Sequence, residues 1–167
     1  MTQVQKSISK RANILAERII QGANTLASYA EQLSKEEWQK PVIGDGRTVG
    51  VIVHHVASVY DLEVELAKVL ASGQPIKEAT NEVVDAMNAE HARENADVDK
   101  IETLALLRHK SQIAAEVVRG FSDKELENSA TVSLYADAPL TAQFFIEDHA
   151  LRHSFHHLAK IKDTIHK

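Results

Sequence analysis

Histidine is the residue type of this chain whose number and spacing point to chemistry. The 167-residue sequence holds nine histidines and no cysteine, and four of the histidines stand between positions 149 and 157. Neutral imidazole binds divalent transition metals well, whereas thiolate ligands and a cysteine nucleophile are excluded here. The chemistry to look for is therefore a metal ion bound by histidines.

Two histidines near the C-terminus share one stripe of a predicted helix. Residues four apart point in nearly the same direction on an α-helix, so His149 pairs with His153, and His153 pairs with His157. On a helical wheel, His153 and His157 fall on the flank of the apolar face, while His149 and His156 fall opposite it. The inward pair is therefore His153 with His157.

A third histidine comes from the segment VIVHHVASVYDLEVEL, where His55 lies on the flank of the apolar face and His54 points away from it. Three neutral histidines leave open positions on a metal ion, which is typical of catalytic sites. Glu63 falls within the apolar arc two turns later, where a buried carboxylate needs a partner. Glu63, or Asp148 in the turn before His153, is a candidate catalytic base or a residue that orients a ligand.

Plainer interpretations compete with a metal site. A pair of histidines four residues apart is often only a surface feature, and Glu63 also fits the edge of the apolar face or an ion pair. The coincidence of histidines on the flanks of two apolar faces favours the metal site. We expect the remaining histidines to be solvated, namely His54, His91, His109, His149, His156 and His166.

Long segments with helical periodicity must position these side chains. Apolar residues recur at intervals of three, four and seven over residues 4–33, 48–72 and 99–121, and residues 78–95 are helical but polar. Thr48 is the expected cap of the second segment, which Gly73 and Pro75 end.

The remaining C-terminal part is predicted to be a loop followed by a helix. Residues 122–139 are expected to be mostly irregular, with SATVSLY extended but lacking a partner strand. The last helix is expected to start near Pro139 and to run to the end of the chain. The pattern predicts an all-α four-helix bundle forming a single domain over residues 1–167.

Composition and charge limit the kinds of partner that we expect this chain to bind. The net charge is −5 and no cluster of lysine and arginine exceeds isolated pairs, so binding to nucleic acid is not expected. No apolar run approaches the roughly 20 residues of a membrane span. The N-terminal residues lack the apolar core of a secretory signal. We therefore expect a cytoplasmic protein that does not bind membranes.

The order of these motifs resembles the DinB-like superfamily, which includes YfiT-type metal hydrolases. The resemblance begins at WQKP, RTV and VIVHHVA, and it closes at HSFHHLAKI, which is similar to the family's final pattern of His, three residues, His. It places metal ligands on His55, His153 and His157. The chain has Ala159-Lys160 where the family often has Gly-Gln, a departure that weakens analogies of substrate more than the metal site.

The resemblance implies an up-down-down-up four-helix bundle, a homodimer, and one divalent metal ion such as zinc, nickel, iron or manganese. It also implies a small-molecule substrate and two kinds of reaction, which are hydrolysis and S-transfer with bacillithiol, mycothiol or glutathione. Because the chain lacks cysteine, such a thiol would be a cosubstrate. The alternatives are a non-catalytic metal-binding or stress-associated bundle, and a helical dimer that holds metal only incidentally. An enclosed cavity beside the histidines would favour an enzyme, because the two alternatives do not require one.

Overall fold

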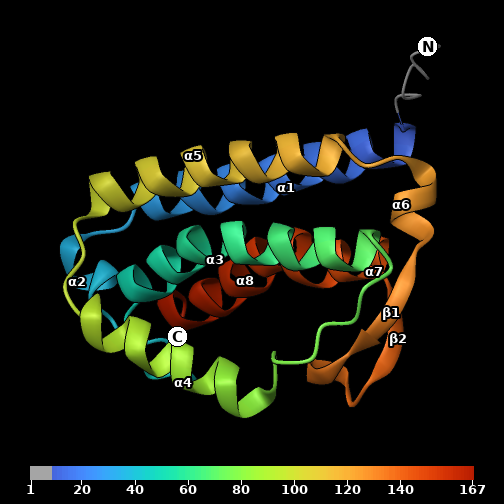
Figure 1. Ribbon diagram of the computed structural model, residues 1–167. Coiled ribbons are helices and arrows are strands. Elements are labelled where there is room, and N and C mark those ends of the chain that lie inside the picture. Colours follow the sequence, from blue (N-terminus) through green and yellow to red (C-terminus); the bar gives the residue numbers. More distant parts are fainter. Residues whose placement is uncertain (1–8) are drawn as a thin grey trace.

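Four long helical elements form the body of the computed structural model, which describes residues 9–167 (Figure 1). They are α1 (Lys10–Glu31), α3 (Val49–Ala71), α5 (Lys100–Arg119), and a fourth made of α7 (Ala142–Ile146), the π-helical segment η2 (Glu147–Leu151) and α8 (Arg152–Ile165). α1 and the fourth helix run in one direction, and α3 and α5 run in the other (Figure 1). The predicted up-down-down-up bundle is therefore confirmed. Residues 4–8 of the expected first helix lie outside the described residues.

An alanine-rich face lets α1 approach its neighbours closely. α1 packs on α5 and on the fourth helix. Larger side chains such as Ile19 and Leu26 are fully buried beside these alanines. Each such side chain contributes roughly 1.5–3 kcal/mol when it leaves water. The core of the bundle is thus formed without any metal ion. The buried alanines are Ala12, Ala16, Ala23, Ala27 and Ala30.

Two contacts fix the start of α3, the helix that carries His55. The Thr48 hydroxyl accepts a hydrogen bond of 3.3 Å from the Val51 N–H, as the predicted cap should. The Trp38 indole packs against Gly50, where an added Cβ would lie 2.6 Å from ring atoms. Its Nε1–H also donates to a backbone carbonyl in the loop before α5. The helix therefore starts at a defined residue, and this sets the direction of His55.

Shorter elements complete the chain. α2 (Lys35–Trp38) precedes α3, and α6 (Asp123–Glu127) follows α5. α4 (Asn81–Glu94) lies outside the four-helix body, below α3 and α8 in Figure 1, and none of its residues is buried. Within the described residues, no helix is both long and apolar enough to cross a membrane.

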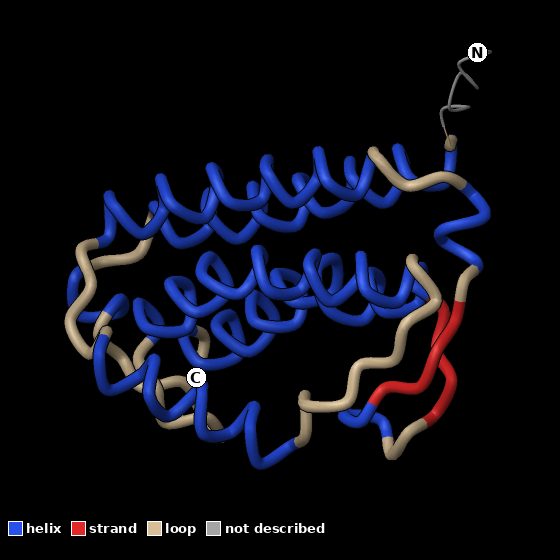
Figure 2. The backbone as a smooth tube through the Cα atoms, in the orientation of Figure 1, coloured by secondary structure: helices blue, strands red, loops and turns tan. Residues whose placement is uncertain are grey.

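A β-hairpin corrects the prediction for the segment before the last helix. β1 (Ser129–Val132) pairs in antiparallel fashion with β2 (Ala138–Thr141), so the SATVSLY segment does have a partner strand (Figure 2). Pro139 lies in β2, opposite Thr131, and does not start the helix. The helix starts at Ala142, capped by Thr141. Left-handed backbone at Ala136 closes the turn, a conformation that sequence periodicity does not reveal.

The π-helical segment changes which side chains of the fourth helix face the core, so part of the helical-wheel prediction is wrong. Its wider turn adds one residue to the helical repeat. Continuing the buried stripe of α8 back from Ser154 in whole α-turns would bury Glu147, but the buried residue is Ile146. In the same way, Phe145 is 2% exposed while Phe144 is 43% exposed. A helical wheel drawn across this segment therefore misplaces the side chains that precede it.

Candidate metal centre

The three histidines predicted as ligands converge. His55 comes from α3, and His153 and His157 come from successive turns of α8. One nitrogen from each ring lies within 4.8 Å of the others. The ring centroids are 5.0 Å apart for His55 and His153, 5.7 Å for His55 and His157, and 4.8 Å for His153 and His157. Small shifts of the rings would bring all three nitrogens within bonding distance of one ion.

Burial keeps two of these rings neutral. Desolvation, reinforced by the neighbouring His153, lowers the pKa of His55 to about 3 and that of His157 to about 2. A neutral imidazole offers a lone pair to a metal, whereas an imidazolium does not. The site therefore presents ligand-competent rings at any pH near neutrality.

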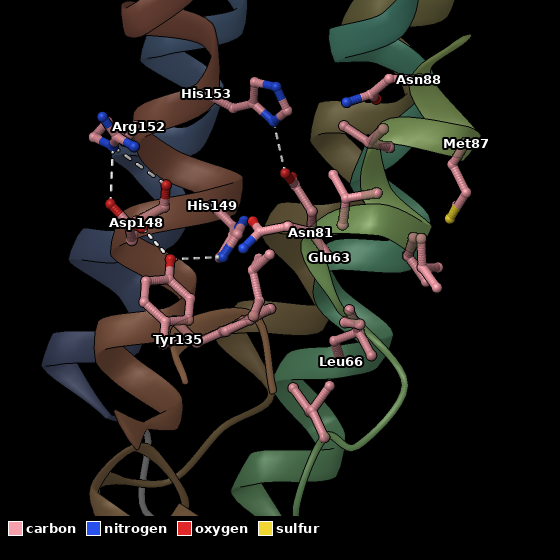
Figure 3. Close-up of a pocket in the computed structure, with 18 of the residues that line it drawn as sticks. Glu63, Leu66, Asn81, Met87, Asn88, Tyr135, Asp148, His149, Arg152 and His153 are labelled. Carbon is pink, nitrogen blue, oxygen red and sulfur yellow. Dashed lines mark hydrogen bonds and ion pairs between the residues drawn. The ribbon is translucent and has the colours of Figure 1, made fainter. Parts of the chain in front are cut away.

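Glu63 orients the third ring. Its Oε1 lies 2.6 Å from Nδ1 of His153, and the carboxylate is buried (Figure 3). Because the carboxylate occupies Nδ1, Nε2 is the nitrogen of His153 left for a metal. A carboxylate on the far nitrogen of a histidine is the usual support of a metal ligand. Glu63 thus has the partner that the sequence required of a buried carboxylate.

Two buried polar atoms of this cluster have no protein partner in the described part of the chain. They are Nδ1 of His157 and Oε2 of Glu63. Leaving a buried polar atom unsatisfied costs about 1–3 kcal/mol, so such atoms are uncommon in native proteins. Their presence beside three convergent imidazoles fits a site that holds a further group. The donor set of three neutral histidines suits zinc, nickel or iron better than manganese, which prefers oxygen ligands.

Asp148 takes a different role from the one considered in the sequence. It accepts a hydrogen bond from the Tyr135 hydroxyl and pairs with Arg152, whose Nε lies 2.9 Å from Oδ1 (Figure 3). Burial and the adjacent carboxylate raise the pKa of Tyr135. The same hydroxyl lies 2.9 Å from Nε2 of His149, so Asp148 supports His149 through Tyr135.

Three of the six histidines expected to be solvated are partly buried. His149 stacks on Phe145, with ring centroids 4.3 Å apart, because the π-helical turn rotates it inward. Nδ1 of His54 lies 2.8 Å from Nε2 of His91 on α4. Burial lowers the pKa of these three rings. His109, His156 and His166 are exposed, as predicted.

A cavity of about 980 Å³ opens beside the histidines. Its wall includes the three converging rings and Glu63, together with side chains of α3, α4 and the β-hairpin. Figure 3 shows Glu63 and Leu66 on one side of this space, across from Tyr135 and His149. A cavity is therefore present beside the histidines, but it is partly open to the surface and not enclosed as expected for an enzyme.

Sequence reasoning did not find the ion pair in the wall of this cavity. The Arg47 guanidinium donates two hydrogen bonds to Asp45, with Nε–Oδ1 at 2.7 Å and Nη2–Oδ2 at 2.9 Å. The guanidinium lowers the pKa of Asp45 and also helps to lower that of His55. Both residues stand in a short glycine-containing loop, where no periodic pattern marks a functional side chain.

Residues 18–161 match the DinB superfamily. Among solved structures, the chain is similar to YfiT from Bacillus subtilis, described as a probable metal-dependent hydrolase with an unusual four-helix bundle topology. The likeness has a TM-score of 0.76 at 18% sequence identity, and it covers 99% of this chain and 92% of that one. A comparison with curated proteins gives no match. The two chains share the fold.

Proposed function

The chain belongs to the DinB superfamily, and we propose that it is a metal-dependent enzyme whose divalent ion is held by His55, His153 and His157. The observation that carries this proposal is the convergence of three imidazoles, two of them kept neutral by burial, on the wall of a cavity. A structural metal site is usually closed by four protein ligands, whereas three leave room for a substrate.

The surrounding residues would each have a defined task. A divalent ion in this position supplies Lewis-acid chemistry, polarising a substrate oxygen or lowering the pKa of a water toward neutrality. Glu63 holds His153 with Nε2 toward the site, and its free Oε2 can accept a proton. Tyr135 holds His149 at the cavity wall. Glu63 is thus proposed as a positioning residue first and as a base second.

Hydrolysis of a small molecule is the reaction class we favour. The description of YfiT as a probable metal-dependent hydrolase supports it, because the two proteins share their fold over nearly the whole length. Thiol S-transfer is the second candidate. The cavity, at about 980 Å³, has room for a thiol cosubstrate beside an acceptor. The chain contributes no thiol of its own.

Metal analysis of protein purified without a histidine tag tests the site. We expect about one equivalent of divalent metal per chain, lost in His55→Ala, His153→Ala and His157→Ala. The matched controls are the sequence neighbours His54→Ala and His156→Ala, which should keep the metal. One equivalent retained by His153→Ala would contradict the proposal, because both histidine pairs possible on the last helix include His153.

Activity screens on the metal-loaded protein then separate the reaction classes. Ester and amide panels test hydrolysis, and conjugation with bacillithiol, mycothiol or glutathione tests S-transfer. Metal binding without turnover in either screen would instead support a non-catalytic metal-binding bundle. The homodimer implied by the family resemblance is part of the proposal, and light scattering at tens of micromolar should give twice the mass of one chain.

A further inference from the structure

The cavity beside the histidines has an apolar half that the metal site does not use. On α3, one stripe of four side chains faces this space and begins about one turn after His55, ending about four turns after it. Of these, Leu62 is 42% exposed although it lies in the middle of a long helix. The stripe comprises Val59, Leu62, Leu66 and Val69.

α4 supplies the opposite apolar wall. Val83 and Met87, one turn apart, line the cavity together with Val84. Val83 is 44% exposed and Met87 is 49% exposed, and no residue of α4 is buried. An amphipathic helix normally covers its apolar face with protein. Here that face lines the cavity, so a molecule that enters the cavity would cover it.

Polar side chains line the same cavity beside these apolar walls. They belong to the three histidines, Glu63, Arg47 and the Tyr135–His149 pair. One space of about 980 Å³ is therefore lined both by the metal-ligating histidines and by apolar side chains of α3 and α4. Its size is that of a site for a small molecule, since such sites measure about 300–1,000 Å³.

We propose that the substrate is an amphipathic small molecule, with an oxygen-bearing head at the histidines and an unbranched or slim apolar tail between α3 and α4. The position of the head rests on the proposed function. The position of the tail rests only on the exposed apolar side chains of the two helices.

A series of n-alkyl hydroxamates tests the tail, because the head chelates a divalent metal while the chain length varies. Affinities of butano-, hexano- and octanohydroxamate for the zinc-loaded protein are measured by calorimetry. Complete burial of one methylene strengthens binding about fourfold, so we expect a gain of about tenfold or more for each two methylenes. A gain of less than about twofold per two methylenes would overturn the proposal, since burying even one methylene should give more.

Substitutions locate the tail. Leu62→Gln and Met87→Gln replace cavity-lining side chains that are largely exposed, so both variants should fold. Each should weaken octanohydroxamate at least about fivefold, the loss of roughly one methylene of burial or more, and leave butanohydroxamate unchanged. Ile113→Gln on α5 is the matched control, because Ile113 is 40% exposed and does not line the cavity. An equal loss in the control would overturn the assignment.

Metal-free protein separates this proposal from the proposed function. In metal-free protein, the affinities for all the hydroxamates should fall together, while the ratio of the affinities for octano- and hexanohydroxamate stays near tenfold. A protein that binds no zinc but keeps this ratio refutes the metal site and supports the apolar half. A protein that binds zinc but shows no dependence on chain length does the reverse.

Discussion

Replacing Glu63 by Gln tests whether this carboxylate positions a metal ligand. Glu63 Oε1 lies 2.6 Å from His153 Nδ1 in a buried setting, so the interaction is a charge-assisted hydrogen bond with little screening by water. The glutamine keeps the shape and loses the charge. Loss of such a supporting group lowers metal affinity about 10–100-fold, or roughly 1.4–2.7 kcal/mol.

The assay is a zinc competition titration against a chromophoric chelator at pH 7.5, with urea unfolding of the metal-free protein in parallel. Glu65→Gln is the control, because Glu65 is exposed on the same helix and pairs with Lys68. Metal-free Glu63→Gln should be about as stable as the parent protein, since the amide removes a buried charge whose Oε2 has no partner. Zinc affinity within threefold of the parent protein would refute the positioning role, as would an equal loss in Glu65→Gln.

Three further predictions concern protonation, packing and the histidine network. Metal-free protein should lose stability as pH falls from 6 to 5, because the unfolded chain protonates histidines that the folded chain keeps neutral. In urea titrations, His157→Asn should reduce this loss by about 1.2 kcal/mol, and a loss equal to that of the parent protein would exclude the lowered pKa of His157. Gly50→Ala should lower the free energy of unfolding in urea by about 1–2 kcal/mol, since the clash with Trp38 exceeds the gain in helix propensity. A variant more stable than the parent protein would contradict this packing. His149 should carry its proton on Nε2 and donate it to the Tyr135 oxygen, because the Tyr135 O–H donates its hydrogen bond to Asp148. ¹⁵N spectra should show this tautomer, and Tyr135→Phe should abolish the preference.

Much of the fold could be predicted from the sequence, because two independent signals mark each long helix. Their apolar periodicity gives their extent, and side chains such as Thr48 and glycines such as Gly73 mark where they begin and end. The β-hairpin did not follow, because its pairing depends on backbone conformation at Ala136 and on strand contacts with Ile76. Such contacts leave no periodic trace in a segment this short.

The histidines that converge were separated from their neighbours by helix geometry alone. His55 and His54 point about 100° apart on one helix, so only one can face α8. The same holds for His157 and His156. His91 could not be found in this way, because it stands on α4, whose inward face borders a cavity and not a core. Hydrophobic patterning detects only surfaces that other side chains cover.

His149 shows how a single inserted residue decides the composition of a site. In a continuous α-helix, His149 would lie about 40° from His153 and about 80° from His157, on the side away from the apolar face. The π-helical turn between them shifts the preceding segment by one residue. Phe145 then enters the core, and His149 stacks on it while reaching Tyr135. The last helix thus places His149, His153 and His157 on the wall of the same cavity, whereas regular α-helical spacing would carry His149 farther from the apolar face that packs in the core.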